Sequence, residues 1–231
     1  MAAIDWSVGA LIHELQRLGI DGDTLICFTS DNGSRVAGEG GSNGPLRGTK
    51  RETWEGGMRL PLLARWPGHI QAGQVSGEIC ASIDLLPTFC ALAGAKLPRR
   101  RIDGRDLSGV LLRGESLPER PFFYYKMDDL EAVRLGRWKR HVRKDFKPFT
   151  ALYDLEADIG ETTDVAARHP EIVARLDAVL QTCREDLGDQ ATGMPGANCR
   201  PIGTVPDPKP LTAYDPAHPY LVAFYDLTEA G

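Results

Sequence analysis

The chain has 231 residues, 42% of them hydrophobic, which is enough to form a buried core in one large or two small domains. Its 27 basic residues are outnumbered by 32 acidic ones, and the net charge of −5 argues against a nucleic-acid-binding surface. No run approaches the ~20 apolar residues of a membrane span, and the residues after Met1 lack the basic start and apolar stretch of a signal peptide.

The first predicted elements are a helix and a strand. Apolar residues recur at helical spacing over residues 3–18, and Gly19 supplies a stop. The apolar run 24–29 then predicts a buried strand. Helix, strand and polar turn form an α/β unit, in which ligands collect beyond the carboxyl ends of strands. Asp31 and Asn32 lie at that end.

Asp31 and Asn32 are candidate metal ligands because their side chains offer the hard oxygen donors that calcium and magnesium prefer. Residues 33–48 contain six glycines, and the backbone N–H groups of such a loop can bind an anion. Lys50 adds a mobile positive charge just beyond the loop. A cation, exposed amides and a lysine together suit sulfate or phosphate. The alternative is a flexible surface loop with a solvated Lys50.

The middle of the chain predicts strands at 60–66 and 75–81, then a helix that ends near Gly94. Asp84 is interpreted as an amino-terminal cap of that helix rather than a metal ligand. The helix is apolar almost all round, which predicts that it is buried. Arg59 can line a pocket beside the loop, or form a structural ion pair with Glu55.

The sequence pattern changes after the Pro118–Pro121 segment. Short β runs there predict an antiparallel meander, followed by a helix from Pro170. The β runs are 122–126, 130–135, 138–142 and 151–155. Seven basic residues between Arg134 and Lys147 are interpreted as the solvated face of these strands. From about Gly188 prolines predict an irregular tail, with a further candidate strand at 220–225. The five cysteines show no metal-binding spacing, and a Cys183–Cys199 pairing stays open.

Several motifs follow one another in a recognisable order. They are the 24–33 strand and turn, Gly-Pro-Leu-Arg-Gly-Thr-Lys at 44–50, Thr-Trp-Glu-Gly-Gly-Met-Arg at 53–59, Trp-Pro-Gly at 66–68, Ser-Ile-Asp-Leu-Leu-Pro-Thr at 82–88, Asp-Gly-Arg-Asp-Leu at 103–107, Leu-Tyr-Asp-Leu at 152–155 and Asp-Ile-Gly-Glu at 158–161. This series closely resembles the arylsulfatase type of the sulfatase family, over about residues 5–187. The likeness covers the carboxyl-terminal half of such an enzyme.

The resemblance implies roles for individual residues. Asp31 and Asn32 match two calcium ligands of the family, and Lys50 matches the catalytic lysine that contacts the sulfate ester. Arg47 and Arg59 are further candidates for substrate binding. The family's nucleophile is a formylglycine made within a Cys/Ser-x-Pro-x-Arg segment, and none of the five cysteines here begins such a segment. Calcium usually takes roughly 6–8 oxygen ligands, so Asp31 and Asn32 leave its shell incomplete.

The expected fold class is α/β, part of a large mixed-sheet sulfatase domain followed by a small α+β subdomain. We place the first part at 1–117, the subdomain at 118–188 and the tail at 189–231. The expected function is that of a sulfatase fragment that is inactive alone, with a sulfate ester as substrate and a separate amino-terminal segment as partner. Alternatives are a phosphoester or phosphonate hydrolase of the same superfamily and a non-catalytic subunit. Sulfatases are often exported, periplasmic or lysosomal, but the compartment stays unknown.

Overall fold

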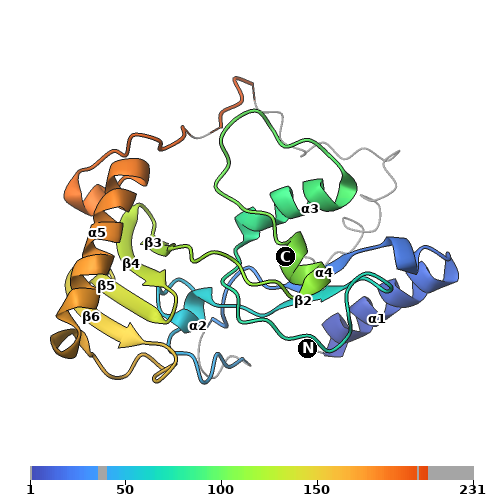
Figure 1. Cartoon of the computed structure of the whole chain (residues 1–231), viewed down its shortest axis with the longest axis horizontal. Helices are drawn as coiled ribbons and strands as arrows, with labels where there is room; N and C mark the ends of the chain where they lie inside the picture. The colour runs from blue at the N-terminus through green and yellow to red at the C-terminus, as the bar shows by residue number, and fades with distance from the viewer. Residues whose placement is uncertain (1, 36–40, 202, 208–231) are drawn as a thin grey trace, which may run out of the picture. The chain divides into compact units, whose positions relative to one another are not determined.

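The computed structural model describes residues 2–35, 41–201 and 203–207 (Figure 1). Contacts divide the chain into two units, Met1–Asn198 and Cys199–Gly231, and the elements below belong to the first. The candidate strand at 220–225 lies outside the described residues. Within the described ranges, no helix is both long and apolar enough to cross a membrane. All five cysteines are free thiols.

The amino-terminal elements are the helix α1 (Ala2–Arg17), the short helix η1 (Asp21–Asp23) and the strand β1 (Ile26–Thr29). β1 pairs antiparallel with β2 (Leu62–Arg65) in a two-stranded sheet. Asp5 in the first turn of α1 and Arg17 in the last complement the helix dipole. These elements confirm the predicted helix and the strands before Asp31 and after Arg59. The prediction that the first strand is buried is wrong, since β1 has no buried residue and Phe28 is 42% exposed in a sheet of only two strands.

The faces of α1 and the two-stranded sheet leave apolar side chains uncovered. No described residue of α1 is buried, and Trp6, Leu11 and Leu63 are 75%, 66% and 64% exposed. A cavity of about 290 Å³ runs between α1 and β1, and its apolar lining is Val8, Leu11, Ile12, Leu15, Ile26, Cys27 and Phe28. Contiguous apolar surface of this kind is typical of an interaction face.

The middle of the chain holds the helices α2 (Glu55–Met58), η2 (Ser82–Asp84), α3 (Leu85–Ala93) and α4 (Ser108–Arg113). The strand predicted at 75–81 is wrong, since those residues have no regular structure and Val75 is 98% exposed. The prediction that α3 is buried is also wrong in part. Pro87 and Thr88 are buried, but Leu86 is 50% exposed because nothing in the described part of the chain covers that side.

Asp84 stands at the N-cap position of α3 but makes no capping bond to that helix; its side chain accepts from the Ala81 N–H at 2.8 Å, at the start of the preceding η2. The carboxylate is buried and accepts hydrogen bonds from the Arg120 guanidinium at 2.6 and 2.7 Å and from the Arg105 amide at 2.9 Å. Burial raises the pKa of Asp84, but these donors outweigh it and leave that pKa below its usual value. Asp84 therefore ties α3 to the segment that leads into the second sheet.

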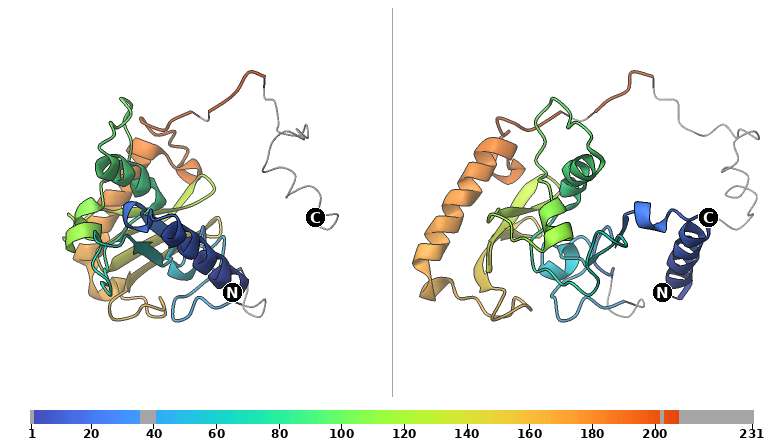
Figure 2. Two further views of the ribbon diagram at one scale, coloured as in Figure 1. Left: turned by 90° about the vertical axis from the view of Figure 1, so that its right-hand side faces the viewer. Right: turned by 45° about the vertical axis from the view of Figure 1, so that its right-hand side comes forward.

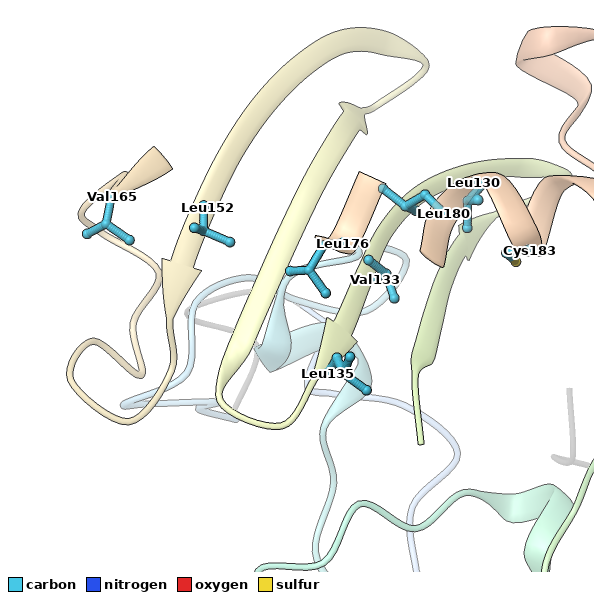
Figure 3. Packing of buried hydrophobic residues seen from close by; sticks show 8 residues of the cluster. All are labelled: Leu130, Val133, Leu135, Leu152, Val165, Leu176, Leu180 and Cys183. Carbon is cyan, nitrogen blue, oxygen red and sulfur yellow. The ribbon is translucent and has the colours of Figure 1, made fainter. Parts of the chain in front are cut away.

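The second sheet is the antiparallel meander β3 (Phe122–Lys126), β4 (Asp129–Leu135), β5 (Trp138–Lys144) and β6 (Lys147–Asp154), in that spatial order. After the short helix η3 (Ala166–Arg168), α5 (Pro170–Leu187) lies along one face of this sheet, as Figure 2 shows. The short helix η4 (Gln190–Thr192) follows. Figure 3 shows the core between α5 and the strands, which contains Leu130, Val133, Leu135, Leu152, Val165, Leu176, Leu180 and Cys183. The mixed α/β fold with an antiparallel sheet and a covering helix confirms the predicted class.

Candidate functional site

The turn after β1 carries the two predicted metal ligands. Asp31 is exposed and Asn32 half-buried, and both follow β1 directly. The Ser30 hydroxyl donates to the Asn32 carbonyl at 2.9 Å. Next in sequence, the buried Gly33 donates its N–H to the Gly57 carbonyl at 3.2 Å, which ties the turn to α2. The two oxygen donors therefore stand on a turn whose backbone is fixed on its carboxyl-terminal side.

The Lys50 segment lies beside this turn. The backbone N–H of Lys50 donates to the Ser34 carbonyl at 3.0 Å. Asn43 closes the loop between them, because its Oδ1 accepts from the Ser34 N–H at 2.7 Å and its Nδ2 donates to the Ser34 and Gly48 carbonyls at 3.2 and 2.9 Å. The Lys50 side chain itself is exposed. The backbone of Lys50 is therefore hydrogen-bonded to Ser34, which is two residues after Asn32 in the sequence.

Three glycines allow these backbones to approach closely. A Cβ at Gly56 would lie 2.5 Å from the Arg47 carbonyl oxygen and 2.6 Å from that of Gly48. A Cβ at Gly33 would overlap the Gly56 carbonyl, and one at Gly57 would overlap that of Glu52. The Gly56 N–H donates to the Arg47 carbonyl at 2.7 Å. Only residues without a side chain permit this crossing of the turn, the loop end and α2.

The two arginines predicted to bind substrate have other contacts. The Arg47 guanidinium lies 3.8 Å above the Trp54 ring and donates to the Glu161 carbonyl at 2.8 Å. Arg59 is exposed, and its Nη1 lies 3.9 Å from Oε2 of the buried Glu55. The alternative ion pair with Glu55 is therefore present. Substrate binding by Arg47 and Arg59 stays a prediction.

A network of buried charges lies behind α2. Glu55 accepts from the Tyr124 hydroxyl at 2.6 Å, from Arg134 Nη1 at 2.8 Å and from Lys139 Nζ at 3.0 Å. Lys139 is fully buried, and its ammonium also lies 2.9 Å from Glu161 Oε1. The interpretation of the basic cluster as a solvated strand face is therefore wrong for Lys139, Arg140 and Lys144, which are all buried. Buried carboxylates from α2 and the chain after β6 attract the ammonium of Lys139 inward.

His141 belongs to the same buried region. Its ring packs 4.7 Å from the Trp54 ring, and its Nε2 lies 3.2 Å from Glu161 Oε1. Burial is the main reason that the pKa of His141 is lowered, and the charges of Lys139 and Lys144 add to it, while Glu161 opposes. Burial raises the pKa of Glu161, but the bond with His141, the charge of Lys139 and the Glu55 N–H outweigh it, so this pKa is lowered.

These shifts predict acid-sensitive stability. Unfolded histidine binds a proton below about pH 6.5, whereas folded His141 stays neutral to lower pH, so the free energy of unfolding falls as the pH drops below about 6.5. The lowered pKa of Glu161 adds a further loss at lower pH, as unfolded glutamate takes up protons near pH 4.3. We expect His141→Gln to reduce the first loss, measured by urea unfolding at about pH 7, 6 and 5. Equal pH slopes for both proteins would contradict the assignment.

The donor types fit a hard divalent cation, but only in part. Asp31 and Asn32 offer carboxylate and amide oxygens, the donors that calcium prefers. Among the described residues, no group of three or more His, Cys, Asp or Glu side chains can hold a metal ion. Calcium binding by Asp31 and Asn32 therefore stays a prediction.

The fold matches solved structures with an alkaline-phosphatase-like fold. A solved structure titled "Crystal structure of Ps i-CgsB in complex with k-i-k-neocarrahexaose" has a TM-score of 0.69 and 31% identity, covering 78% of this chain and 40% of that chain. The phosphonate monoester hydrolase of Agrobacterium radiobacter has a TM-score of 0.60 and 25% identity, covering 79% of this chain and 39% of its own.

The family model named Sulfatase matches residues 1–95. N-acetylgalactosamine-6-sulfatase of Mus musculus is 44% identical over 179 residues, which are 73% of this chain and 34% of that protein. Arylsulfatase A of Homo sapiens is 37% identical over 253 residues, which are 89% of this chain and 50% of that protein. The chain belongs to the sulfatase family. It spans between a third and a half of the length of these two relatives.

Sequence reasoning missed Asn43 and the buried charges. Asn43 stands in a glycine-rich loop whose composition signals flexibility, and nothing local marks it as the residue that joins the loop's two ends. Lys139 meets Glu55, which lies 84 residues earlier, so no spacing within a strand reveals the pair. The sequence signal for the buried charges was the high density of basic residues in the segment that forms β4 to β6.

Proposed function

We propose that this chain carries part of a site for sulfate-ester hydrolysis, in which Asp31 and Asn32 bind calcium and Lys50 contacts the sulfate group. The observation that carries the proposal is the 3.0 Å hydrogen bond from the Lys50 amide to the Ser34 carbonyl, just beyond the Asp31–Asn32 turn. Membership of the sulfatase family supports the reaction class. The chain spans only part of its relatives, so the activity is proposed for the assembled site.

The chemistry of the proposed site is electrostatic. When bound, calcium would act as a Lewis acid on the sulfuryl oxygens. Asp31 and Asn32 would orient that ion by their fixed turn, while the Lys50 ammonium would donate to the ester as negative charge develops on the departing oxygen. Roughly half or more of a shell of 6–8 oxygens would come from water or other residues. The isolated 231 residues are therefore expected to bind calcium weakly.

The nucleophile is proposed to come from outside these 231 residues, in the same or a separate polypeptide. None of the five cysteines begins a Cys-x-Pro-x-Arg segment, and the one Ser-x-Pro-x-Arg match, Ser116–Arg120, has its arginine paired with the buried Asp84. The uncovered apolar faces of α1 and the β1–β2 sheet support contact with a further segment, since a core of this kind needs a cover. A non-catalytic chain that only contributes this half of a site remains the competing account.

One observation favours a second candidate reaction. The similarity to a phosphonate monoester hydrolase points to a phosphorus ester as the alternative substrate. Both kinds of ester present a tetrahedral anion to a cation and a lysine, so the residues that these reactions share do not separate them. Paired assays with an aryl sulfate and an aryl phosphate separate them directly.

The proposal predicts a large effect at Lys50. We expect no measurable aryl sulfate hydrolysis by the 231-residue chain, and activity when an amino-terminal sulfatase segment with the nucleophile motif is added. In that assembly, Lys50→Ala should lower kcat by about 10²–10³-fold, and Asp31→Ala should remove the calcium requirement together with the activity. Lys96→Ala, at another exposed lysine, is the matched control and should leave the rate unchanged.

Three results would contradict this reading. Robust activity of the chain alone, abolished by Lys50→Ala, would show that the site is complete without another segment. Full activity of Lys50→Ala in the assembly would remove the lysine from the mechanism. A higher kcat/KM for the aryl phosphate would favour the alternative reaction.

A further inference from the structure

The helix α2 is hydrogen-bonded both to the turn after β1 and to the loop that leads to Lys50. It nevertheless has only four residues, Glu55–Met58. A single helical turn is unstable by itself because nucleation costs more than its few hydrogen bonds return. Something outside α2 must therefore hold it in place. The contacts of its first residue, Glu55, identify what does.

Glu55 is bound on both its backbone and its side chain. Its N–H donates to the Glu161 carboxylate at 2.7 Å. Its own carboxylate, which is fully buried, accepts from Tyr124 on β3, from Arg134 on β4 and from Lys139 on β5. Three neighbouring strands of the antiparallel sheet thus converge on one side chain. Lys139 also donates to the Thr53 carbonyl at 2.8 Å, which fixes the residues before α2.

The next residues pass this constraint to the site. Gly56 donates to the Arg47 carbonyl at 2.7 Å, near the end of the loop that leads to Lys50. Gly57 accepts from the Gly33 N–H at 3.2 Å, directly after Asp31 and Asn32. The backbones approach so closely here that a Cβ at Gly33, Gly56 or Gly57 would overlap a carbonyl of the neighbouring segment. A shift of α2 would move both segments.

We propose that Glu55 is a positioning residue, through which the antiparallel sheet holds the Asp31–Asn32 turn and the Lys50 segment at their mutual distance. This inference rests on the proposed function for its chemical meaning. It assigns the second sheet a part in building the site, beside its role in packing against α5. In this proposal Glu55 acts through the backbone of α2, and its carboxylate also lies 3.9 Å from the exposed Arg59.

Glu55→Gln is the sharpest single test. The glutamine keeps the shape of the side chain but has one acceptor oxygen, so its NH₂ group must face donors from Lys139 and Tyr124 or from Arg134. Asp189→Asn is the matched control, because Asp189 is also a buried carboxylate paired with an arginine, Arg184 at 2.9 Å, but does not contact α2.

The first readout is amide hydrogen exchange in the full chain. We expect Glu55→Gln to speed exchange at the Gly33 and Lys50 amides by about tenfold, while amides of Leu176 and Leu180 in α5 change no more than in Asp189→Asn. A residue that only adds global stability would affect all four amides alike. If Glu55→Gln does not fold, Tyr124→Phe removes one donor and should give the same local pattern at smaller amplitude.

The second readout is a calcium titration followed by NMR shifts at Asp31 and Asn32, with Asp31→Ala as the control for the metal. We expect Glu55→Gln to weaken calcium binding about tenfold, and Asp189→Asn to leave it unchanged. Exchange at Gly33 and Lys50 that is equal in Glu55→Gln and Asp189→Asn would overturn the inference. A wild-type chain without any calcium response would overturn the proposed function instead, and the exchange rates would still decide whether Glu55 holds the loop.

Discussion

Replacing Gly56 by alanine is expected to lower the free energy of unfolding by about 3 kcal/mol. The added Cβ would lie 2.5 Å from the Arg47 carbonyl oxygen and 2.6 Å from that of Gly48, and both are backbone atoms that cannot rotate away. Relief requires α2 to move, which would also break the Gly56 N–H bond to Arg47. Urea unfolding monitored by tryptophan fluorescence gives the loss directly, since Trp54 is buried beside this crossing.

Gly77→Ala is the control for Gly56→Ala. No atom lies within 4 Å of a Cβ built on Gly77, so this alanine meets open space. Its effect should stay within about 0.5 kcal/mol. A Gly56→Ala protein as stable as Gly77→Ala would mean that the backbone crossing of Arg47, Gly48 and α2 is looser than the structure has it.

Lys139→Met is expected to destabilise the chain by about 3–5 kcal/mol. Methionine fills a similar volume but leaves the buried Glu55 and Glu161 carboxylates without the ammonium that lies 3.0 and 2.9 Å from them. An uncompensated buried charge costs more than the pair itself contributes, so the loss reflects the carboxylates left behind. Equilibrium unfolding at neutral pH measures the loss.

The exposed Lys147 on β6 provides the comparison for Lys139. Lys147→Met removes the same charge from the same sheet, and should change stability by less than about 0.5 kcal/mol. The double variant Lys139→Met with Glu55→Gln should be less destabilised than the sum of its single variants, since each removes one side of the same pair. Equal losses for the two lysine variants would contradict the buried network.

Regular elements were the part of the fold that sequence patterns predict well. The 3.6-residue period of α1 and α5 indicates one apolar face in each helix, and that face is buried in α5 but uncovered in α1. The short β runs after residue 121 likewise correspond to strands of the second sheet. The segment 75–81 failed because its apolar residues find no partner strand among the described residues. The predicted burial of α3 was wrong in part. The apolar character of a helix shows that its surface needs to be covered, but it does not show which segment covers it.

The candidate site divides in the same way. The turn with Asp31 and Asn32 follows from a strand that ends in polar residues, and the structure brings the Lys50 backbone beside that turn through Ser34. The contacts that hold it could not be predicted, because Tyr124 and Glu161 reach Glu55 across 69 and 106 residues of chain. Pairing over such separations is set by topology rather than by spacing.

The side chain of Asn43 has a consequence for how this fold can diversify. The Asn43 side chain is hydrogen-bonded to the backbone of Ser34 and of Gly48. The geometry at the base of the loop therefore does not depend on how many residues lie between Ser34 and Asn43. Lengthening a loop that is already pinned at its base costs little entropy, about 0.6 kcal/mol for each doubling. Insertions there would leave the Asp31–Asn32 turn and the Lys50 segment in place, so the length of this loop can vary without disturbing the proposed site.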